Sequence, residues 1–359
     1  MADYFEIDFL AVETKKSGDA ISIRYEIGGQ TYIHVVDGGY QSTGDKMAAH
    51  IKQYYGNPAS INHVVVTHSD GDHTVGLRTV LEQFNVGALW MLRPWRYADE
   101  LIDRFARFTS VDGLRARLKE IYPNLVALEE IAIEKGIPIY EPFQGTYIGA
   151  FTVLAPSKTR YLDLVVESDK TPEPAAEKSV ASIFGDAART LLEKAAAFVK
   201  AAWGEEVFST EGTSAENEMS VIQYAYLSGK RIVLNGDAGR GGLIEAANFA
   251  QSIGLVLPGV DKFQVPHHGS RRNVSTEILD TWLGPKLASK PDHGTFEAMC
   301  SSAKEDEDHP RKSVRRAFVH RGAKFYATEG QSIQFRGGDV PDRGWPSATP
   351  MDYPDDQEE

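Results

Sequence analysis

Two histidines and two aspartates stand close together in residues 67–73, whose sequence is Thr-His-Ser-Asp-Gly-Asp-His. The apolar run 64–66 comes directly before them, which places them at the end of a predicted buried strand. Imidazole and carboxylate groups crowded at one strand end destabilise the fold unless a cation offsets them. The segment therefore predicts a metal site. The alternative is a turn in which the aspartates cap the following helix.

Two later segments have the same character. Residues 231–234 form a predicted strand that runs into Asp237, and residues 263–265 form another that runs into His267 and His268. Rigid strand ends are where a preorganised site can be held. The predicted metal ligands are His68, Asp70, Asp72, His73, Asp237, and His267 or His268, with the choice between the last two left open.

The composition restricts the kind of site. Cys300 is the only cysteine, so an intrachain disulfide and thiolate-rich metal sites are excluded. The net charge of −13 argues against a broad surface that coats nucleic acid, because such binding depends on Lys and Arg. No apolar run approaches the ~18 residues that cross a bilayer, and the N-terminus lacks a leader pattern. We therefore expect a cytoplasmic protein without a membrane partner.

Basic residues are concentrated late in the chain. Residues 309–324 contain six Lys or Arg and no Asp or Glu. This stretch is either an anion-binding surface or the solvated face of a helix. Arg271 and Arg272 follow the histidine pair closely enough to reach a substrate phosphate, although simple surface charge is the alternative.

The hydrophobic pattern predicts a sheet-rich α/β chain with one large domain, 1–338. An inserted helical section occupies 158–215 and contains a helix at 181–202. An acidic, proline-rich tail at 339–359 is predicted to be disordered. Strands are predicted at 7–12, 20–27, 31–36, 62–66, 88–91, 151–155, 219–227, 231–234, 262–265, 324–327 and 332–335, and helices at 47–55, 74–84 and through most of 97–134.

These segments together resemble the metallo-β-lactamase superfamily, most closely its branch typified by the hydrolase domain of the competence protein ComEC. The resemblance runs in family order from residue 5 to about 336, except for the inserted section. It is carried by Ser-Gly-Asp-Ala at 17–20, Val-Asp-Gly-Gly at 36–39, the segment 67–73, Asn217 to Ser220, Gly-Asp at 236–237, Val-Pro-His-His-Gly-Ser at 265–270 and Asp-His-Pro at 308–310.

The resemblance implies an αββα sandwich with metal ions at one edge, a hydroxide held between them, and hydrolysis of an ester or phosphodiester. It also implies that Asp37 lies behind the site and orients a ligand histidine. It assigns His68 and Asp70 to one metal, Asp72, His73 and a histidine of the 267/268 pair to the other, and Asp237 to a bridge between them.

The chain departs from the common superfamily pattern in two ways. Asp70 stands where His is usual, as in the ComEC branch, and this moves the preference toward Mn²⁺ or Mg²⁺ without excluding Zn²⁺. No histidine lies between His73 and His267, so the usual third-motif ligand is missing. Its place is vacant, filled by water, or taken by Asn217, Glu218 or His293. One or two ions per chain are both consistent with this pattern.

Three functions follow from these residues. The leading hypothesis is a phosphodiesterase or nuclease with a metal-activated hydroxide. In this hypothesis Asp72 and His309 transfer protons during catalysis. Arg271, Arg272 and Arg311 bind the phosphate of a nucleic acid or nucleotide-like substrate. The second is a lactonase or other carboxylic-ester hydrolase. The third is a degenerate member that binds a protein partner through the helix at 181–202 without catalysis.

Overall fold

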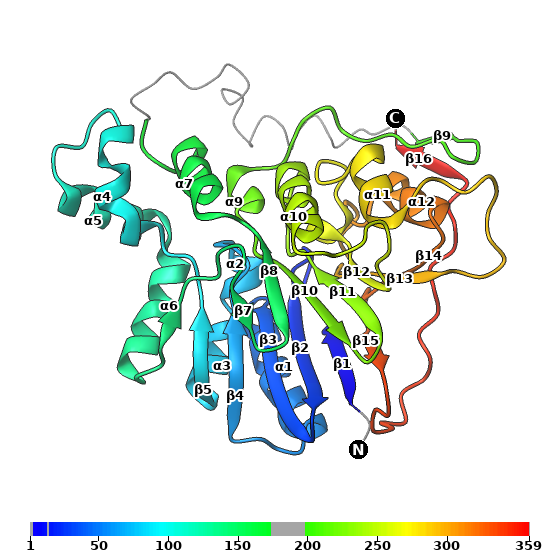
Figure 1. The fold of residues 1–359 in the computed structure, drawn as a ribbon, viewed down its shortest axis with the longest axis horizontal. Coiled ribbons are helices and arrows are strands. Elements are labelled where there is room, and N and C mark those ends of the chain that lie inside the picture. The colour runs from blue at the N-terminus through cyan, green and yellow to red at the C-terminus, as the bar shows by residue number, and fades with distance from the viewer. Residues whose placement is uncertain (1–2, 13, 174–197, 359) are drawn as a thin grey trace.

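Two sheets of seven strands each pack face to face in the middle of the molecule, and helices cover their outer faces (Figure 1). The computed structural model describes residues 3–12, 14–173 and 198–358. The core lies between the sheets, where Phe9 and Phe335 meet edge to face with their ring centroids 5.4 Å apart. This is the four-layer αββα sandwich predicted from the sequence.

The first sheet begins as an antiparallel meander and continues as parallel strands, with the order β15-β1-β2-β3-β4-β5-β6. Parallel neighbours need helical crossovers, which here lie on the outer face. The strands are β1 (Tyr4–Phe9), β2 (Ala20–Ile27), β3 (Gln30–Gly38), β4 (Ser60–Val65), β5 (Asn85–Trp90), β6 (Ile139–Tyr140) and β15 (Ile333–Gly337), and the helices are α1 (Gln41–Tyr54), α2 (Gly71–Thr74) and α3 (Leu77–Gln83).

The second sheet has the order β14-β13-β12-β11-β10-β8-β7, and its strands from β11 to β14 are parallel. The parallel strands again send their crossovers over the outer face (Figure 1). The strands are β7 (Tyr147–Ile148), β8 (Phe151–Ala155), β10 (Ile222–Leu227), β11 (Lys230–Leu234), β12 (Lys262–Gln264), β13 (Phe296–Cys300) and β14 (Ala323–Ala327), and the helices are α10 (Arg240–Ser252), α11 (Thr276–Leu283) and α12 (Lys312–His320).

The remaining helices and strands lie outside the two sheets and the helices already named. Side-chain caps set some of their starts: Ser110 Oγ accepts from the Gly113 N–H, and Ser157 Oγ accepts from the Arg160 N–H. These elements are η1 (Pro94–Tyr97), α4 (Ala98–Leu101), η2 (Ile102–Arg104), α5 (Val111–Ile121), α6 (Pro123–Glu134), α7 (Lys158–Glu167), β9 (Phe198–Lys200), α9 (Ala215–Glu218), η5 (Pro266–Gly269) and β16 (Asp356–Glu358).

The inserted section differs from its prediction. Most of the helix predicted at 181–202 lies outside the described residues. Its last part is wrong, because Phe198–Lys200 forms strand β9 and pairs with β16 near the end of the chain. The section does contain one well-packed helix, α7, which buries Tyr161, Leu164 and Val165.

The end of the chain is also different from the predicted disordered tail. Residues 338–358 run back along the molecule and end in β16. The Trp345 ring meets the Tyr54 ring at 5.3 Å, and the buried Glu358 carboxylate accepts the N–H groups of Lys312 and Ser313 at the start of α12. Apolar contact and helix capping therefore hold a segment whose composition alone suggested disorder.

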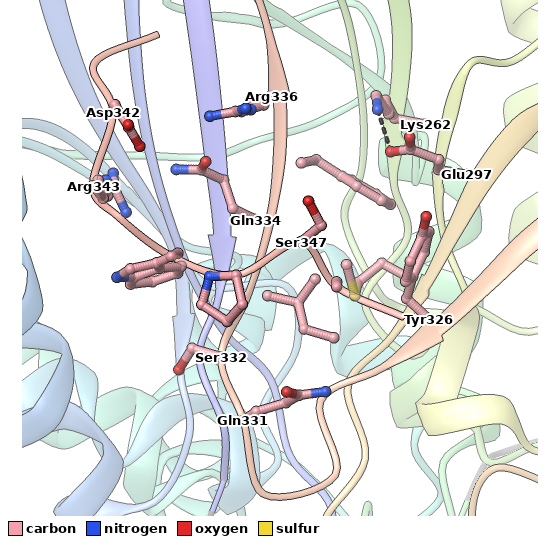
Figure 2. Close-up of a pocket in the computed structure, with 16 residues that line it drawn as sticks. Lys262, Glu297, Tyr326, Gln331, Ser332, Gln334, Arg336, Asp342, Arg343 and Ser347 are labelled. Atoms are coloured by element: carbon pink, nitrogen blue, oxygen red, sulfur yellow. Dashed lines mark hydrogen bonds and ion pairs between the residues drawn. The ribbon is translucent and has the colours of Figure 1, made fainter. Parts of the chain in front are cut away.

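A cavity of about 700 Å³ lies under this returning segment (Figure 2). Arg343 and Ser347 line it from the segment, and Gln334 lines it from β15. Lys262 and Glu297, which form an ion pair in its wall, stand at or near the first residues of β12 and β13. Within the described residues, no helix is long and apolar enough to span a membrane.

Candidate metal centre

The predicted site residues come together at one edge of the sandwich. The segment after β4 carries the first four, the loop after β11 carries Asp237, and the turn after β12 carries the histidine pair. Backbone hydrogen bonds join these loops: the Val221 N–H donates to the Thr67 carbonyl at 3.0 Å, and the His267 N–H donates to the Gly236 carbonyl at 3.2 Å. Rigid elements therefore hold groups that are remote in the chain.

The Asp237 carboxylate lies at the centre of four imidazole rings. Its Oδ1 is 3.4 Å from His73 Nε2, and its Oδ2 is 3.6 Å from His267 Nε2, 3.7 Å from His268 Nε2 and 3.9 Å from His68 Nε2. The residue is only 3% exposed, so the group is withdrawn from solvent. A buried carboxylate in this position is the one that the sequence predicts as a bridging ligand.

Asp72 reaches the same cluster from the loop after β4. Its Oδ2 lies 3.5 Å from His268 Nε2 and 3.7 Å from His73 Nε2. One carboxylate and two imidazole nitrogens, supplied by two loops far apart in sequence, therefore enclose one position. Together with Asp237, these are the ligands that the family resemblance assigns to one of the two metals.

Asp70 lies at the rim of the cluster. Its Oδ2 is 3.8 Å from His68 Nε2, and its Oδ1 accepts a hydrogen bond from Lys170 Nζ at 2.9 Å. Asp70 also stands at the N-cap position of α2, but its side chain makes no capping hydrogen bond. The Asp70 carboxylate therefore does not cap the helix, which was the alternative to a metal ligand.

Several buried ligand atoms have no hydrogen-bond partner among the described residues. They include the Nε2 atoms of His68, His73 and His268 and the Oδ1 atom of Asp237. Buried polar atoms are normally paired, because leaving them unpaired destabilises the fold. Ligand atoms about 2.1 Å from a tetrahedral ion lie about 3.4 Å from one another, close to the spacing found here. These residues fit a divalent cation.

The other ring nitrogens are held so that Nε2 points into the cluster. His73 Nδ1 is 2.8 Å from Asp37 Oδ2, which places Asp37 where the sequence predicted it. Asp37 is fixed in turn by the Thr67 N–H at 2.9 Å and the Thr67 hydroxyl at 2.6 Å. His268 Nδ1 lies 2.9 Å from the Ser301 carbonyl, to which it donates. Such contacts set the tautomer that leaves Nε2 available to an ion.

The histidine pair occupies a strained turn. His267 and His268 both adopt positive φ, at 48° and 53°, a conformation that costs side-chain-bearing residues about 1 kcal/mol or more each. Gly269 follows at φ 87°, and a Cβ there would lie 2.6 Å from Pro310 Cβ. The turn directs both rings at Asp237, which gives a functional reason for the strain.

The geometry distinguishes the two histidines. His268 is 4% exposed and approaches both Asp72 and Asp237. The side chain of His267 is 25% exposed and approaches Asp237 alone, while its Nδ1 lies 2.9 Å from Asn273 Oδ1. His268 is therefore the better candidate for the ligand shared with Asp72, and His267 faces the open side of the site.

Two of the three candidates for the missing third-motif ligand are wrong. The Glu218 carboxylate accepts from the Gly242 N–H at 2.7 Å at the start of α10 and pairs with Arg160 at 2.6 Å, so it serves the helix. His293 is exposed and precedes β13, whereas Ser301, beside the site, follows the end of that strand.

Asn217, the third candidate, does lie beside the site. Its Nδ2 is 3.3 Å from His267 Nδ1 and donates to Thr213 Oγ1 at 2.7 Å. Two hydroxyls face the other ring nitrogen of His68: Thr67 Oγ1 lies 3.0 Å and Ser220 Oγ lies 3.3 Å from His68 Nδ1. The His68 end of the cluster therefore gains no additional imidazole.

His309 joins the cluster from the loop before α12. Its ring centroid is 5.8 Å from that of His267 and 6.1 Å from that of His268. Its Nδ1 lies 3.3 Å from Asp306 Oδ2. Burial, together with the neighbouring His267 and His268, lowers the pKa of His309 although Asp306 opposes the shift. The surroundings of His309 therefore favour its neutral form.

Two of the three predicted substrate-binding arginines, Arg311 and Arg272, pair with carboxylates. Arg311 Nη2 pairs with Asp308 at 3.0 Å, and Arg272 Nη2 pairs with Glu211 at 3.3 Å. The Arg271 carbonyl accepts from Arg240 and from the Ser209 N–H. Their role toward substrate stays a prediction.

The basic stretch 309–324 is neither an open anion-binding surface nor a solvated helix face at Arg316 and Arg321, which are buried. Arg316 is fully buried and donates to the Pro354 carbonyl at 2.7 Å. Arg321 pairs with Glu206 at 2.6 Å. Lys312 pairs with Asp356 at 2.7 Å. Remote carboxylates and carbonyls satisfy charges that looked unopposed in the sequence.

Charge within the cluster is strongly coupled. Burial alone would raise the pKa of Asp237, but His73, His268 and His267 together hold it well below its ordinary value. Burial alone would lower the pKa of His268, but Asp237 and Asp72 raise it to about 9. His68 differs, because burial lowers its pKa. We call Asp72, Asp237 and the four histidines around Asp237 the cage. Binding of a cation in the cage should release protons from its imidazoles.

Asp19 also lies at the site, although it is not among the ligands predicted from the sequence. Its Oδ2 accepts from Gln264 Nε2 at 3.0 Å and lies 3.8 Å from His73 Nδ1. Burial raises its pKa, and its ligand atom groups with those of Asp237 and His268. The signal was present in the segment 17–20, one of the pieces that carried the family resemblance.

The comparisons with known proteins agree with the fold. Residues 22–147 match the model of the metallo-beta-lactamase superfamily. No curated protein matches the chain. The metallo-beta-lactamase fold protein YhfI from Bacillus subtilis is 8% identical, with TM-score 0.41, and the match covers 93% of this chain and 100% of that one.

Two further solved structures are similar. A diphosphatase from the PhnP family is 11% identical, with TM-score 0.37 and coverage of 94% of this chain and 99% of that one. A metallo-beta-lactamase from Hirschia baltica is 10% identical, with TM-score 0.29 and coverage of 70% and 81%. The superfamily match and the two packed sheets define a metallo-β-lactamase fold.

Proposed function

We propose that this protein is a metal-dependent hydrolase that cleaves phosphodiester bonds in nucleic acid or in a nucleotide-like diester. The observation that carries the proposal is the buried cage around Asp237, in which three imidazole nitrogens have no partner among the described residues. A cation would satisfy these buried atoms, and hydrolysis is the chemistry that metal sites on this scaffold support. The phosphodiester specificity rests on the resemblance to ComEC-type hydrolase domains.

The donor set favours Mn²⁺ or Zn²⁺. Imidazole nitrogens suit zinc and other transition metals, whereas carboxylate oxygens suit Mn²⁺ and Mg²⁺. His73, His268, Asp72 and Asp237 would hold one ion, and His68 and Asp70 would contribute to a second that shares Asp237. A bound divalent cation supplies water activation at neutral pH and stabilises charge on a phosphoryl oxygen.

The remaining residues act on protons and on orientation. Asp306 holds the neutral His309 ring through Nδ1–H, which leaves His309 Nε2 as a proton acceptor near the cluster. Asp72 stays ionised because His73 and His268 lower its pKa despite burial. Asp72 is therefore a ligand and an acceptor of hydrogen bonds rather than an acid.

The substrate must enter from the solvent side of the cage. The cavity behind His68, lined by Leu92, Tyr122 and Met219, has a volume of about 20 Å³, which is enough for about one water molecule. An acyl group has no room there, and this disfavours a lactone seated behind His68. Arg311, whose backbone N–H donates to the carbonyl of Gly269, next to the histidine pair, at 3.1 Å, is the arginine we favour for a phosphate contact.

A substrate panel tests the proposal. Protein stripped of metal and reloaded with Mn²⁺ or Zn²⁺ would be assayed against bis(p-nitrophenyl) phosphate, single- and double-stranded DNA, lactones and a β-lactam. We expect turnover of the phosphodiesters and its loss with a chelator. Lactone turnover without phosphodiester cleavage would replace the proposal with the carboxylic-ester alternative. A protein that binds ions but turns over nothing would favour the non-catalytic alternative.

A further inference from the structure

Lys170 contacts a predicted metal ligand. Its Nζ lies 2.9 Å from Asp70 Oδ1, while the other oxygen of Asp70 lies 3.8 Å from His68 Nε2. Among ion pairs between described residues, this is the one that joins a Lys or Arg to a predicted ligand. An ammonium group therefore lies beside the position where His68 and Asp70 are predicted to hold an ion.

A well-anchored turn places Lys170 there. Ser168 ends α7, its N–H donates to the Leu164 carbonyl at 2.9 Å, and its Oγ accepts from the Lys170 N–H at 3.0 Å. The Ser168 hydroxyl also binds Glu216, and Thr171 Oγ1 donates to the Val165 carbonyl at 2.8 Å. Because Ser168 and Thr171 are buried, the backbone position of Lys170 is fixed on both sides.

The two sides of the cage offer unequal ligands. Asp72, His73 and His268 belong to one side, and all three approach one another within 4.8 Å. His68 and Asp70 are the predicted ligands of the other side, where a third-motif histidine is missing. Catalytic ions are usually held by three protein ligands, so the side with His68 depends on the shared Asp237.

We propose that the Lys170 ammonium competes for Asp70 with the ion on the His68 side. The chain then binds a first ion tightly on the side with Asp72, His73 and His268, and a second ion weakly on the side with His68 and Asp70. The inference rests on the metal centre of the proposed function. An ion that enters between His68 and Asp70 must displace the ammonium or meet its positive charge. The side chain of Lys170 is 46% exposed, so this competition is modest in size.

Calorimetric titration of the metal-stripped full chain with Mn²⁺ tests the inference without using activity. In the wild type we expect the second ion to bind at least about tenfold more weakly than the first. In Lys170→Met we expect second-ion binding to tighten about fivefold, or about 1 kcal/mol, with the first ion unchanged. Lys170→Arg keeps the charge and should bind like the wild type.

Lys158→Met is the matched control. Lys158 is also 46% exposed and pairs with Glu100 at 2.7 Å away from the cage, so its loss should leave both affinities unchanged. A Lys170→Met variant with wild-type second-ion affinity would overturn the inference. So would a wild type that binds two ions equally tightly. Ion binding as expected with no phosphodiester cleavage would reject the proposed function and leave the inference standing.

Discussion

The two sides of Asp237 differ in how far the surrounding structure prepares them for an ion. On the His73 side, which comprises Asp72, His73 and His268, both imidazoles are oriented by hydrogen bonds from behind. On the His68 side, which comprises His68 and Asp70, the Thr67 and Ser220 hydroxyls also orient the imidazole from behind, but the carboxylate is turned partly toward Lys170. The same seven-residue segment thus supplies ligands to two unequal positions.

The difference comes from what other parts of the chain add. The turn after β12 contributes His268 to the His73 side, and β3 contributes Asp37 behind it. The His68 side receives the Ser220 hydroxyl and the Lys170 ammonium instead. Ligand number and orientation, rather than the motif, therefore decide where an ion binds tightly.

Replacement of the shared carboxylate should have the largest effect. Asp237→Asn removes the charge that balances the surrounding imidazoles, and we expect Mn²⁺ affinity and hydrolysis to fall by about a thousandfold. Calorimetry and the phosphodiester assay measure this. Asp261→Asn is the control, because Asp261 pairs with Arg231 outside the cage. Unchanged ion binding in Asp237→Asn would remove the basis of the comparison.

Single histidine variants should separate the two sides. His268→Ala takes a ligand from the His73 side, and we expect the tight ion to bind about a hundredfold more weakly. His68→Ala should weaken only the second ion and leave the first within about threefold. Mn²⁺ titration of both variants measures the contrast. Equal losses in the two variants would contradict unequal sides.

The pH dependence of ion binding should also differ between the sides. Despite burial, Asp237 and Asp72 raise the pKa of His268 to about 9, so its proton competes with an ion below that pH. Asp237, Asp72 and Asp37 also raise the pKa of His73 well above its ordinary value despite burial. Affinity on the His73 side should therefore fall by at least about tenfold per pH unit from pH 9 to pH 7. Burial lowers the pKa of His68, so its side should show no such loss.

Titration in two buffers with different protonation enthalpies measures the protons released at each step. We expect release with the first ion and none with the second. Release of protons only with the second ion would assign the tight position to the His68 side instead.

Replacement of Asp37, which lies behind His73, should have the smallest effect on ion binding among these substitutions. Asp37→Asn keeps the shape of the side chain but removes the charge that orients His73, and we expect Mn²⁺ affinity to fall by about ten- to a hundredfold. Calorimetry measures the loss, with Asp45→Asn as a control, since Asp45 accepts from Thr79 away from the cage. A loss confined to the second ion would mean that Asp37 does not support the His73 side.

Local patterns predicted much of the scaffold. Strands β2 and β8 were predicted with the bounds that the structure shows. Helix α10 was not predicted, because it begins in a glycine-rich segment and packs mainly small alanines, which give a weak apolar period. The predicted helix 74–84 corresponds to α3, which begins three residues later, at Leu77, and ends one residue earlier, at Gln83. Gly76, just before α3, packs so closely on the Gly38 carbonyl that a side chain there would clash.

The sequence by itself determined the ligand types and their position after apolar strands, because side-chain chemistry and strand period are local properties. Only the tertiary structure decided which charges meet. It placed Asp19 beside His73, turned Lys170 onto Asp70, and satisfied Arg316 with the chain end. Partners in such contacts are separated by tens to hundreds of residues, and no local pattern encodes the parallel strands that bring them together.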